Sequence, residues 1–143
     1  MALSARLAAV VDALPLTPSS RVLEVGCGPG AAARAVAERL DDGHVLAVDR
    51  SATAVAQARR AAADLIAAGR LEVRQTAVED LRLEPGEEPY DLAFAVRVGV
   101  LDGRHPRDHD RALEQIRAAV RPGGRLYVDG GDPLREVRLP PPP

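Results

Sequence analysis

Three glycines, Gly26, Gly28 and Gly30, alternate with other residues directly after the apolar run Val22 to Val25. Glycine has no side chain, so a loop of this kind lets the backbone approach a bound molecule closely. The loop lies between an expected strand and an expected helix, and open parallel sheets bind ligands at that end of their strands. A tight turn alone does not need three alternate glycines. We therefore predict that this loop contacts a ligand.

Two carboxylates accompany the loop. Glu24 stands two residues before the first glycine, and Asp49 ends the next apolar run, about twenty residues beyond the loop, where a carboxylate can accept hydrogen bonds from both ribose hydroxyls of a nucleoside. Residues 28–33 also fit the loose dinucleotide pattern G-x-G-x-x-A. Glu24 argues against a dinucleotide, because its charge would repel a pyrophosphate but could bind an ammonium group. The 143 residues also leave no second mononucleotide half, so a dinucleotide reductase is the weaker alternative.

Buried strands and amphipathic helices alternate around these residues. The expected strands are 22–25, 45–48, 71–75, 92–96 and 126–128, and the expected helices are about 2–14, 31–40, a long one between Ser51 and Gly69, and 107–120. Such alternation predicts a three-layer α/β/α fold with a mostly parallel, five-stranded sheet. One domain is expected over 1–131, and the Pro-rich tail, 132–143, is expected to be extended or disordered.

Several segments resemble the motifs of one enzyme family, the class I S-adenosylmethionine-dependent methyltransferases. Residues 22–30, Val-Leu-Glu-Val-Gly-Cys-Gly-Pro-Gly, closely resemble motif I of that family. The further matching segments are 47–51, 79–81, 90–94 and 113–128, the last with its Arg-Pro-Gly-Gly turn. The resemblance covers about residues 20–130. It implies a Rossmann-like fold with S-adenosylmethionine as cofactor.

The resemblance also implies which residues bind that cofactor. They are Glu24, Gly26, Cys27, Gly28, Gly30, Asp49, Arg50, Ala77, Val78 and Val96. Glu24 would lie near the methionine amino group, and Asp49 would hold the ribose. The family often has an acidic residue beside the adenine, whereas this chain has Ala77 there, which leaves the Val78 amide to bind the base.

Catalytic residues are not fixed by the sequence. Methyl transfer from a sulfonium is an in-line displacement that mainly needs two groups held together, with a base only for a protonated acceptor. Arg97 and His105 are the candidates. Arg97 follows the fourth strand and could bind an anionic acceptor, or it could pair instead with Asp91 or Asp102. His105 and His109 lie near the expected mouth of the site, and either could be a base.

Composition excludes several other functions. The net charge of −2 and the 2% of aromatic residues give no reason to expect nucleic acid as a partner. A single cysteine, Cys27, excludes an internal disulfide and a multi-thiolate metal site, so no metal is expected. No apolar run reaches the length of a membrane span. We expect a soluble, cytoplasmic protein without a membrane partner.

The expected function is methyl transfer from S-adenosylmethionine to a small-molecule acceptor. The alternative is a non-catalytic S-adenosylmethionine-binding module or a subunit of a larger complex. The family usually adds an antiparallel strand pair after the fifth strand, and no such pair is expected here. The fifth strand, 126–128, should then lie at a sheet edge, where an unpaired apolar strand invites a second copy. Two outcomes could cover this edge: the tail from Gly130 to Leu139 folds back over it, or a second copy packs there. The tail offers only Leu134, Val137 and Leu139 as apolar anchors, so a homodimer through this edge is expected.

Overall fold

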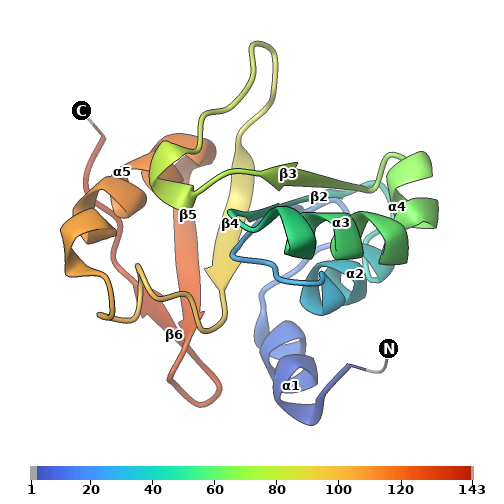
Figure 1. The fold of residues 1–143 in the computed structure, drawn as a ribbon, viewed down its shortest axis with the longest axis horizontal. Helices are drawn as coiled ribbons and strands as arrows, with labels where there is room; N and C mark the ends of the chain where they lie inside the picture. Colours follow the sequence, from blue (N-terminus) through green and yellow to red (C-terminus); the bar gives the residue numbers. More distant parts are fainter. Residues whose placement is uncertain (1–2, 143) are drawn as a thin grey trace.

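The computed structural model describes residues 3–142 (Figure 1). Residue 2 of the expected first helix and residue 143 of the expected tail therefore lie outside the described part. The strands are β1 Arg21–Val25, β2 His44–Asp49, β3 Leu71–Gln75, β4 Tyr90–Ala95, β5 Val120–Asp129 and β6 Leu134–Val137. The α-helices are α1 Ala5–Ala13, α2 Ala31–Glu38, α3 Ala52–Ala61, α4 Ala63–Ala67 and α5 His109–Ala119, and the 3-10 helices are η1 Val78–Asp80 and η2 Pro106–Asp108.

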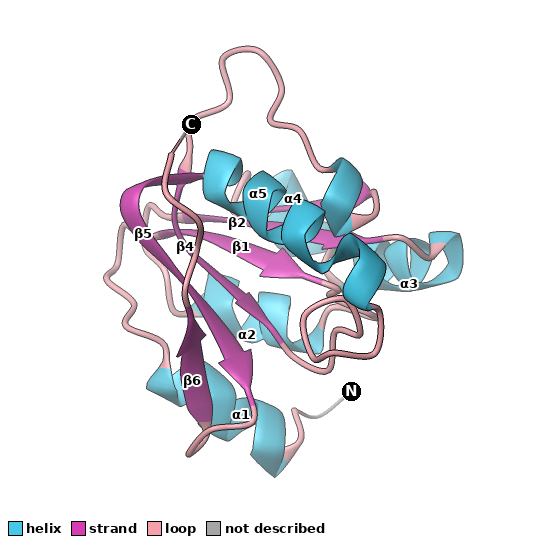
Figure 2. Cartoon of the chain, turned by 90° about the vertical axis from the view of Figure 1, so that its left-hand side faces the viewer, coloured by secondary structure: helices cyan, strands magenta, loops and turns pink. Residues whose placement is uncertain are grey.

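All the strands belong to one sheet in the order β3-β2-β1-β4-β5-β6. The first five are parallel, and β6 runs antiparallel to β5. Neighbouring residues of a strand point to opposite faces, so β1 contributes Val22 to one hydrophobic core and Leu23 to the other. Helices α1 to α4 cover the first face, and α5 with η1 covers the second (Figure 2). The predicted three-layer Rossmann-like fold is confirmed.

Local signals also fix the helix that follows β2. The Ser51 hydroxyl accepts a hydrogen bond from the Ala54 amide at 3.2 Å, as an N-cap does, and Gly69 has the positive φ of a C-terminal glycine. The helix is not continuous, however. Ala62 leaves the helical backbone conformation, so the predicted single helix is divided into α3 and α4.

The sheet has six strands within residues 3–142, so the prediction of five was wrong. Residues 134–137 of the Pro-rich tail are extended, but as β6, which pairs antiparallel with β5 from Leu126 opposite Val137 to Asp129 opposite Leu134. The predicted unpaired edge of the fifth strand is therefore also wrong. The backbone of β5 has partners on both sides within the chain, and the homodimer inferred from that edge loses its structural basis.

Candidate functional site

The glycine loop connects β1 to α2, at the ends of the central strands. Gly26, Gly28 and Gly30 have φ of 69°, 54° and 89°, the left-handed region that glycine adopts without strain. The amides of Gly26 and Cys27 both donate to the carbonyl of Val48, at 2.8 and 3.0 Å. The loop is thus fastened to β2, and its alternate glycines are each required by the backbone.

Asp49 holds the loop from the end of β2. Its Oδ2 accepts a hydrogen bond from the Gly28 amide at 2.8 Å, and its Oδ1 accepts one from the Ser51 amide at 2.9 Å. A carboxylate oxygen has two lone pairs, so each oxygen can still accept a second hydrogen bond. Asp49 can therefore order both loops and bind a pair of hydroxyls at the same time.

Glu24 is buried beneath the loop, with 3% of its surface exposed. Burial raises the pKa of its carboxyl to about 8, against the effect of a hydrogen bond from the Ala33 backbone and together with the nearby charge of Asp49. Its Oε1 has no hydrogen-bond partner among residues 3–142. A buried polar atom without a partner costs free energy. The site therefore has an unsatisfied acceptor that an ammonium group would satisfy.

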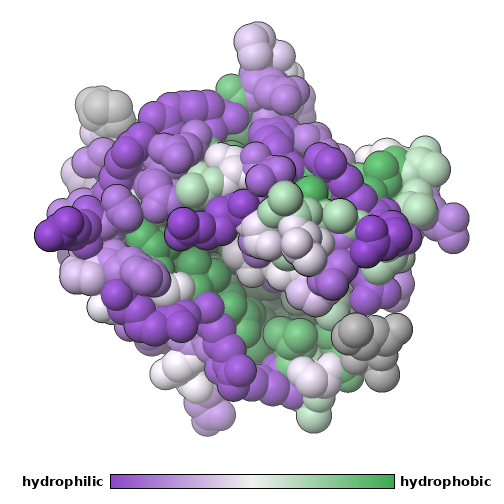
Figure 3. All heavy atoms as spheres, viewed as in Figure 1, coloured by the Kyte–Doolittle hydropathy of each residue, from purple (hydrophilic) through white to green (hydrophobic). Residues whose placement is uncertain are grey.

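Two cavities open at the ends of the strands, and the residues Gly26 and Arg97 line both. The first, the β2–β3 cavity, has a volume of about 270 Å³ and lies between the ends of β2 and β3 and the segment after β4. The second, the α1 cavity, has about 500 Å³ and lies between the glycine loop and α1. Figure 3 shows a hollow lined by hydrophobic residues next to α1, below the ends of β4 and β5.

The predicted cofactor residues are distributed over these two cavities. The α1 cavity is lined by Glu24, Gly26, Cys27, Gly28 and Val96. The β2–β3 cavity is lined by Asp49, Arg50, Ala77 and Val78, again with Gly26. Gly30 lines neither cavity. It precedes α2 as its N-cap residue and packs against Ala58, since a Cβ added to Gly30 would lie only 3.1 Å from the Ala58 Cβ.

Sequence reasoning missed the contribution of α1. Its first turn lines the α1 cavity with Ser4, Arg6 and Leu7, and Ser4 caps the helix by accepting the Leu7 amide at 3.2 Å. The helical periodicity of this segment predicts a helix but not where it packs. Val98, after β4, was missed as well. It lines the β2–β3 cavity and packs against the glycine loop, since a Cβ on Gly26 would lie only 2.6 Å from its Cγ2.

Arg97 has an unusual backbone conformation. It is the one non-glycine residue with positive φ, 56°, within residues 3–142. Its amide donates to Asp129 Oδ1 and its carbonyl accepts from Arg104 Nη2, each at 3.0 Å. Strain of this kind persists only where the surroundings enforce it and is common at functional sites.

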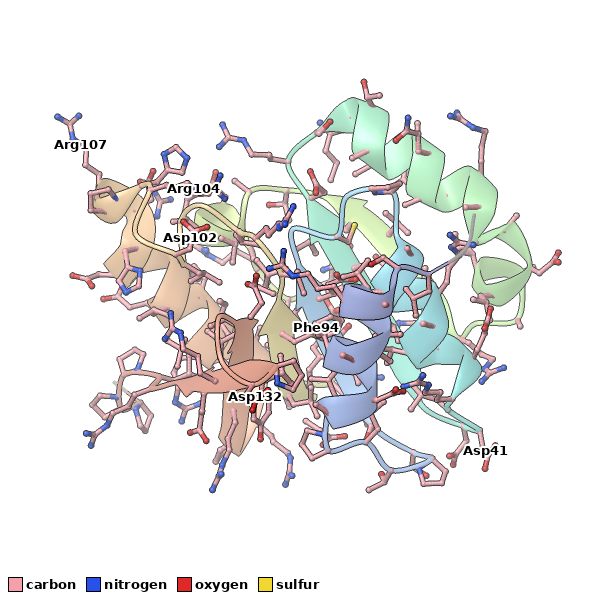
Figure 4. All side chains as sticks on the ribbon, turned by 90° about the horizontal axis from the view of Figure 1, so that it is seen from below. Asp41, Phe94, Asp102, Arg104, Arg107 and Asp132 are labelled. Carbon is pink, nitrogen blue, oxygen red and sulfur yellow. The ribbon has the colours of Figure 1, made fainter. Side chains whose placement is uncertain are left out.

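The side chain of Arg97 pairs with neither of the carboxylates considered from the sequence. Asp91 pairs with Arg121 at 3.0 Å, and Asp102 pairs with Arg104 at 2.9 Å. Figure 4 shows Asp102 and Arg104 together on the loop after β4. Arg97 lines both cavities, and its side chain forms no ion pair within residues 3–142.

The histidines and the cysteine differ in what they can do. His109 Nδ1 lies 3.0 Å from the Val100 carbonyl, and His44 Nδ1 lies 2.9 Å from the Gly69 carbonyl, so both have structural partners. His105 instead lines the β2–β3 cavity. Burial, and then the charges of Glu24 and Asp49, raise the pKa of Cys27 to about 12, which disfavours a nucleophilic thiolate.

Two further features are absent from the described residues, 3–142. None of their helices has the length and apolar character needed to cross a membrane. No three of their His, Cys, Asp or Glu side chains are grouped as a metal site would require.

Fold and site together define a Rossmann-like domain with a glycine loop beside two cavities at the ends of its parallel strands. Residues 22–124 match the family model of the methyltransferase domain, and the chain belongs to that family. A protein of transposon Tn4556 from Streptomyces fradiae is 36% identical over 87% of this chain and 33% of its own length. A trans-aconitate 2-methyltransferase from Azoarcus sp. is 32% identical over 80% of this chain and 40% of its own.

Solved structures agree with this assignment. An S-adenosylmethionine-dependent methyltransferase from Mesorhizobium loti superposes with a TM-score of 0.68 at 25% identity, over 87% of this chain and 53% of that one. The cyclase SpnF gives a TM-score of 0.69 at 27% identity, over 85% of this chain and 42% of that one. The predicted membership of the class I S-adenosylmethionine-dependent methyltransferases is confirmed, and S-adenosylmethionine is the cofactor of that family. The chain spans a third to a half of the length of the curated relatives it matches.

Proposed function

We propose that this chain binds S-adenosylmethionine across the two cavities and transfers its methyl group to a small-molecule acceptor. One observation carries the proposal. The glycine loop lies between two carboxylates of different character, Asp49 with free acceptor sites at one cavity and the buried, unsatisfied Glu24 at the other. A nucleoside that carries an amino acid has ribose hydroxyls for the first carboxylate and an ammonium group for the second.

The β2–β3 cavity would hold the adenosine part. Asp49, with Arg50 beside it, would bind the ribose, and Ala77 leaves room beside the base. Val78 begins η1, so its amide has no acceptor within that helical turn and can donate to the adenine. Cys27 and Gly28 would contact the amino-acid part in the α1 cavity, whose ammonium would bind to Glu24.

Bound S-adenosylmethionine supplies an electrophilic methyl group on a sulfonium. The contribution of the protein is to hold the acceptor in line with that methyl group and to exclude water. Val96 and Arg97 follow β4, where the two cavities meet, so their side chains would face the acceptor. Arg97 would orient an anionic acceptor, and His105 would take a proton from an acceptor that carries one.

Several relatives support a small-molecule acceptor. The chain is similar to trans-aconitate 2-methyltransferases from more than one bacterium, at 28–36% identity. A second candidate function is a binding domain without methyl transfer. It is supported only by the similarity to SpnF, whose description names a cyclase and not a methyltransferase. Turnover separates the two, because only an enzyme converts S-adenosylmethionine to S-adenosylhomocysteine with an acceptor.

Calorimetry tests the proposal. S-adenosylhomocysteine should bind, and Asp49→Ala should weaken it by about 1.5–3 kcal/mol, the scale of hydrogen bonds to a charged group. Asp41→Ala is the matched control, since Asp41 is exposed in the segment between α2 and β2 and lines neither cavity. Tighter binding of NADH than of S-adenosylhomocysteine would contradict the proposal.

We propose further that the protein acts in the cytoplasm, without nucleic acid or a membrane as partner. Support comes from the single, unpaired cysteine, which suits a reducing compartment, and from the net charge of −2. A homodimer is not part of the proposal, because β6 covers the edge that suggested it.

A further inference from the structure

The first turn of α1 brings a cation to the α1 cavity. Arg6 lines this cavity on the side of α1, and Glu24 lines it on the side of the sheet. Arg6 lies before the segment 22–124 that the family model covers. The helix is held in place by Val10 and Val11, which pack in the same hydrophobic core as Phe94 of β4.

Asp129, at the end of β5, fixes the position of Arg6. Its Oδ2 accepts a hydrogen bond from Arg6 Nη2, and its Oδ1 accepts the amide of Arg97. The Asp129 side chain is 17% exposed, whereas that of Arg6 is 48% exposed. A guanidinium has five N–H donors, and this ion pair uses one of them. Arg6 is thus oriented by Asp129 and keeps donors for a second carboxylate.

We propose that Arg6 binds the α-carboxylate of the cofactor's amino-acid part while Glu24 binds its ammonium group. This inference rests on the proposed function. An α-amino acid carries both charges on one carbon, so their two receptors must line one cavity. Arg6 and Arg97 are the cationic side chains that line the α1 cavity. Arg97 also borders the β2–β3 cavity, at the strand end assigned to the acceptor, whereas Arg6 borders the α1 cavity.

The proposal gives Asp129 a positioning role. Because it holds both the Arg6 side chain and the strained Arg97 backbone, it connects α1 to the segment after β4. It would not contact the cofactor itself. Asp129→Asn keeps an acceptor for the Arg97 amide and removes the charge that orients Arg6. This variant should lose part of the affinity that Arg6→Ala loses.

The test compares two ligands that differ only in the carboxylate, S-adenosylhomocysteine and its decarboxylated form, S-adenosyl-3-thiopropylamine. Calorimetry on the full chain measures both. Arg6→Ala should weaken S-adenosylhomocysteine roughly ten- to hundredfold, as expected for the loss of a charge-assisted hydrogen bond. It should leave the affinity for the decarboxylated ligand unchanged, and Arg6→Lys should restore part of the loss.

A control on the same helix separates recognition from packing. Asp12→Asn breaks the ion pair of α1 with Arg39, 2.7 Å long, at a surface outside the α1 cavity. It should change neither affinity. Equal weakening of both ligands by Arg6→Ala, or no weakening at all, would overturn the role of Arg6 and leave the proposed function standing. If the wild-type chain binds neither ligand, the proposed function fails and this inference fails with it.

Discussion

The buried carboxyl of Glu24 lowers the stability of the folded protein and lines the candidate site. A carboxyl that is buried without a full set of partners resists ionisation, and its pKa of about 8 lies far above the usual 4.5. The folded state therefore binds a proton that the unfolded chain has already released at neutral pH. Such strain is common where a protein prepares a site for a ligand, and the ammonium group that we propose for this site would supply the missing partner of Glu24.

The pH dependence of stability follows from this shift. The folded pKa is raised, so the contribution of Glu24 is complete below about pH 4.5 and is lost as the pH rises to about 8. Glu24→Gln removes the ionisation and should raise the free energy of unfolding above pH 8 by a few kcal/mol, since one pKa unit is worth about 1.4 kcal/mol. The same variant should bind S-adenosylhomocysteine more weakly.

Urea unfolding at pH 5 and pH 9 measures the effect, with Glu38→Gln on the exposed face of α2 as the control for losing one carboxylate. The gain from Glu24→Gln should be much larger at pH 9. A gain that is equal at both pH values, or a destabilisation at pH 9, would show that the Glu24 carboxyl is not strained in the folded protein.

The two carboxylates also show what sequence can reveal about single residues. Their spacing from the glycines places Glu24 and Asp49 at the site, and both line its cavities. Spacing does not reveal that Asp49 accepts the Gly28 amide or that Glu24 lacks a partner, because these depend on how the loop closes. The left-handed backbone of Arg97 is equally invisible, since Asp129 enforces it from 32 residues away.

At the scale of elements, glycines in the loop are required for two reasons: a positive φ and, at some positions, a lack of space for a side chain. Gly26 and Gly28 both have positive φ, so an alanine at either position costs about 1–2 kcal/mol of backbone strain. Their surroundings differ. A Cβ on Gly26 would meet Val98 at 2.6 Å, whereas a Cβ on Gly28 has nothing within 4 Å and would project into open space.

This difference predicts that alanine at Gly26 mainly lowers stability, whereas alanine at Gly28 mainly lowers the affinity for S-adenosylhomocysteine. Gly26→Ala should be the more destabilising, because the segment after β4 must also shift away from the new methyl group. Gly28→Ala should lose less stability, but it should weaken S-adenosylhomocysteine strongly, because its methyl group occupies ligand space in the α1 cavity. Thermal melts and calorimetry on both variants measure the two effects. Equal stability losses would show that the Val98 contact adds nothing to the backbone strain.

The elements themselves are largely predictable from sequence. The apolar runs become β1 to β4, and the helices lie where periodicity and caps indicate them, as Ser51 does for α3, apart from the division at Ala62. The signals are local, which is why they succeed. The packing of α1 against the glycine loop is not local, so its residues in the α1 cavity were not predicted.

At the scale of the whole molecule, β6 is the feature that sequence does not indicate. Leu134–Val137 is four residues long, with Arg135 and Glu136 in its centre, and shows no period that would mark it as a strand. It forms because β5 offers an unpaired backbone a few residues away, so that a short turn is sufficient. Its own outer edge is short and charged, which discourages pairing with another chain.

This arrangement predicts that the tail keeps the chain monomeric. Deleting 132–143 leaves the backbone of β5 without its antiparallel partner and uncovers Leu126 and Val128, which are buried in the second core. The shortened chain should therefore self-associate at micromolar concentration and melt at a lower temperature, while the 143-residue chain stays monomeric. Deleting only 140–143 keeps β6 and serves as the control. Light scattering after gel filtration decides the question, because a dimer of the 143-residue chain, or a shortened chain that remains a stable monomer, would show that β6 does not protect this edge.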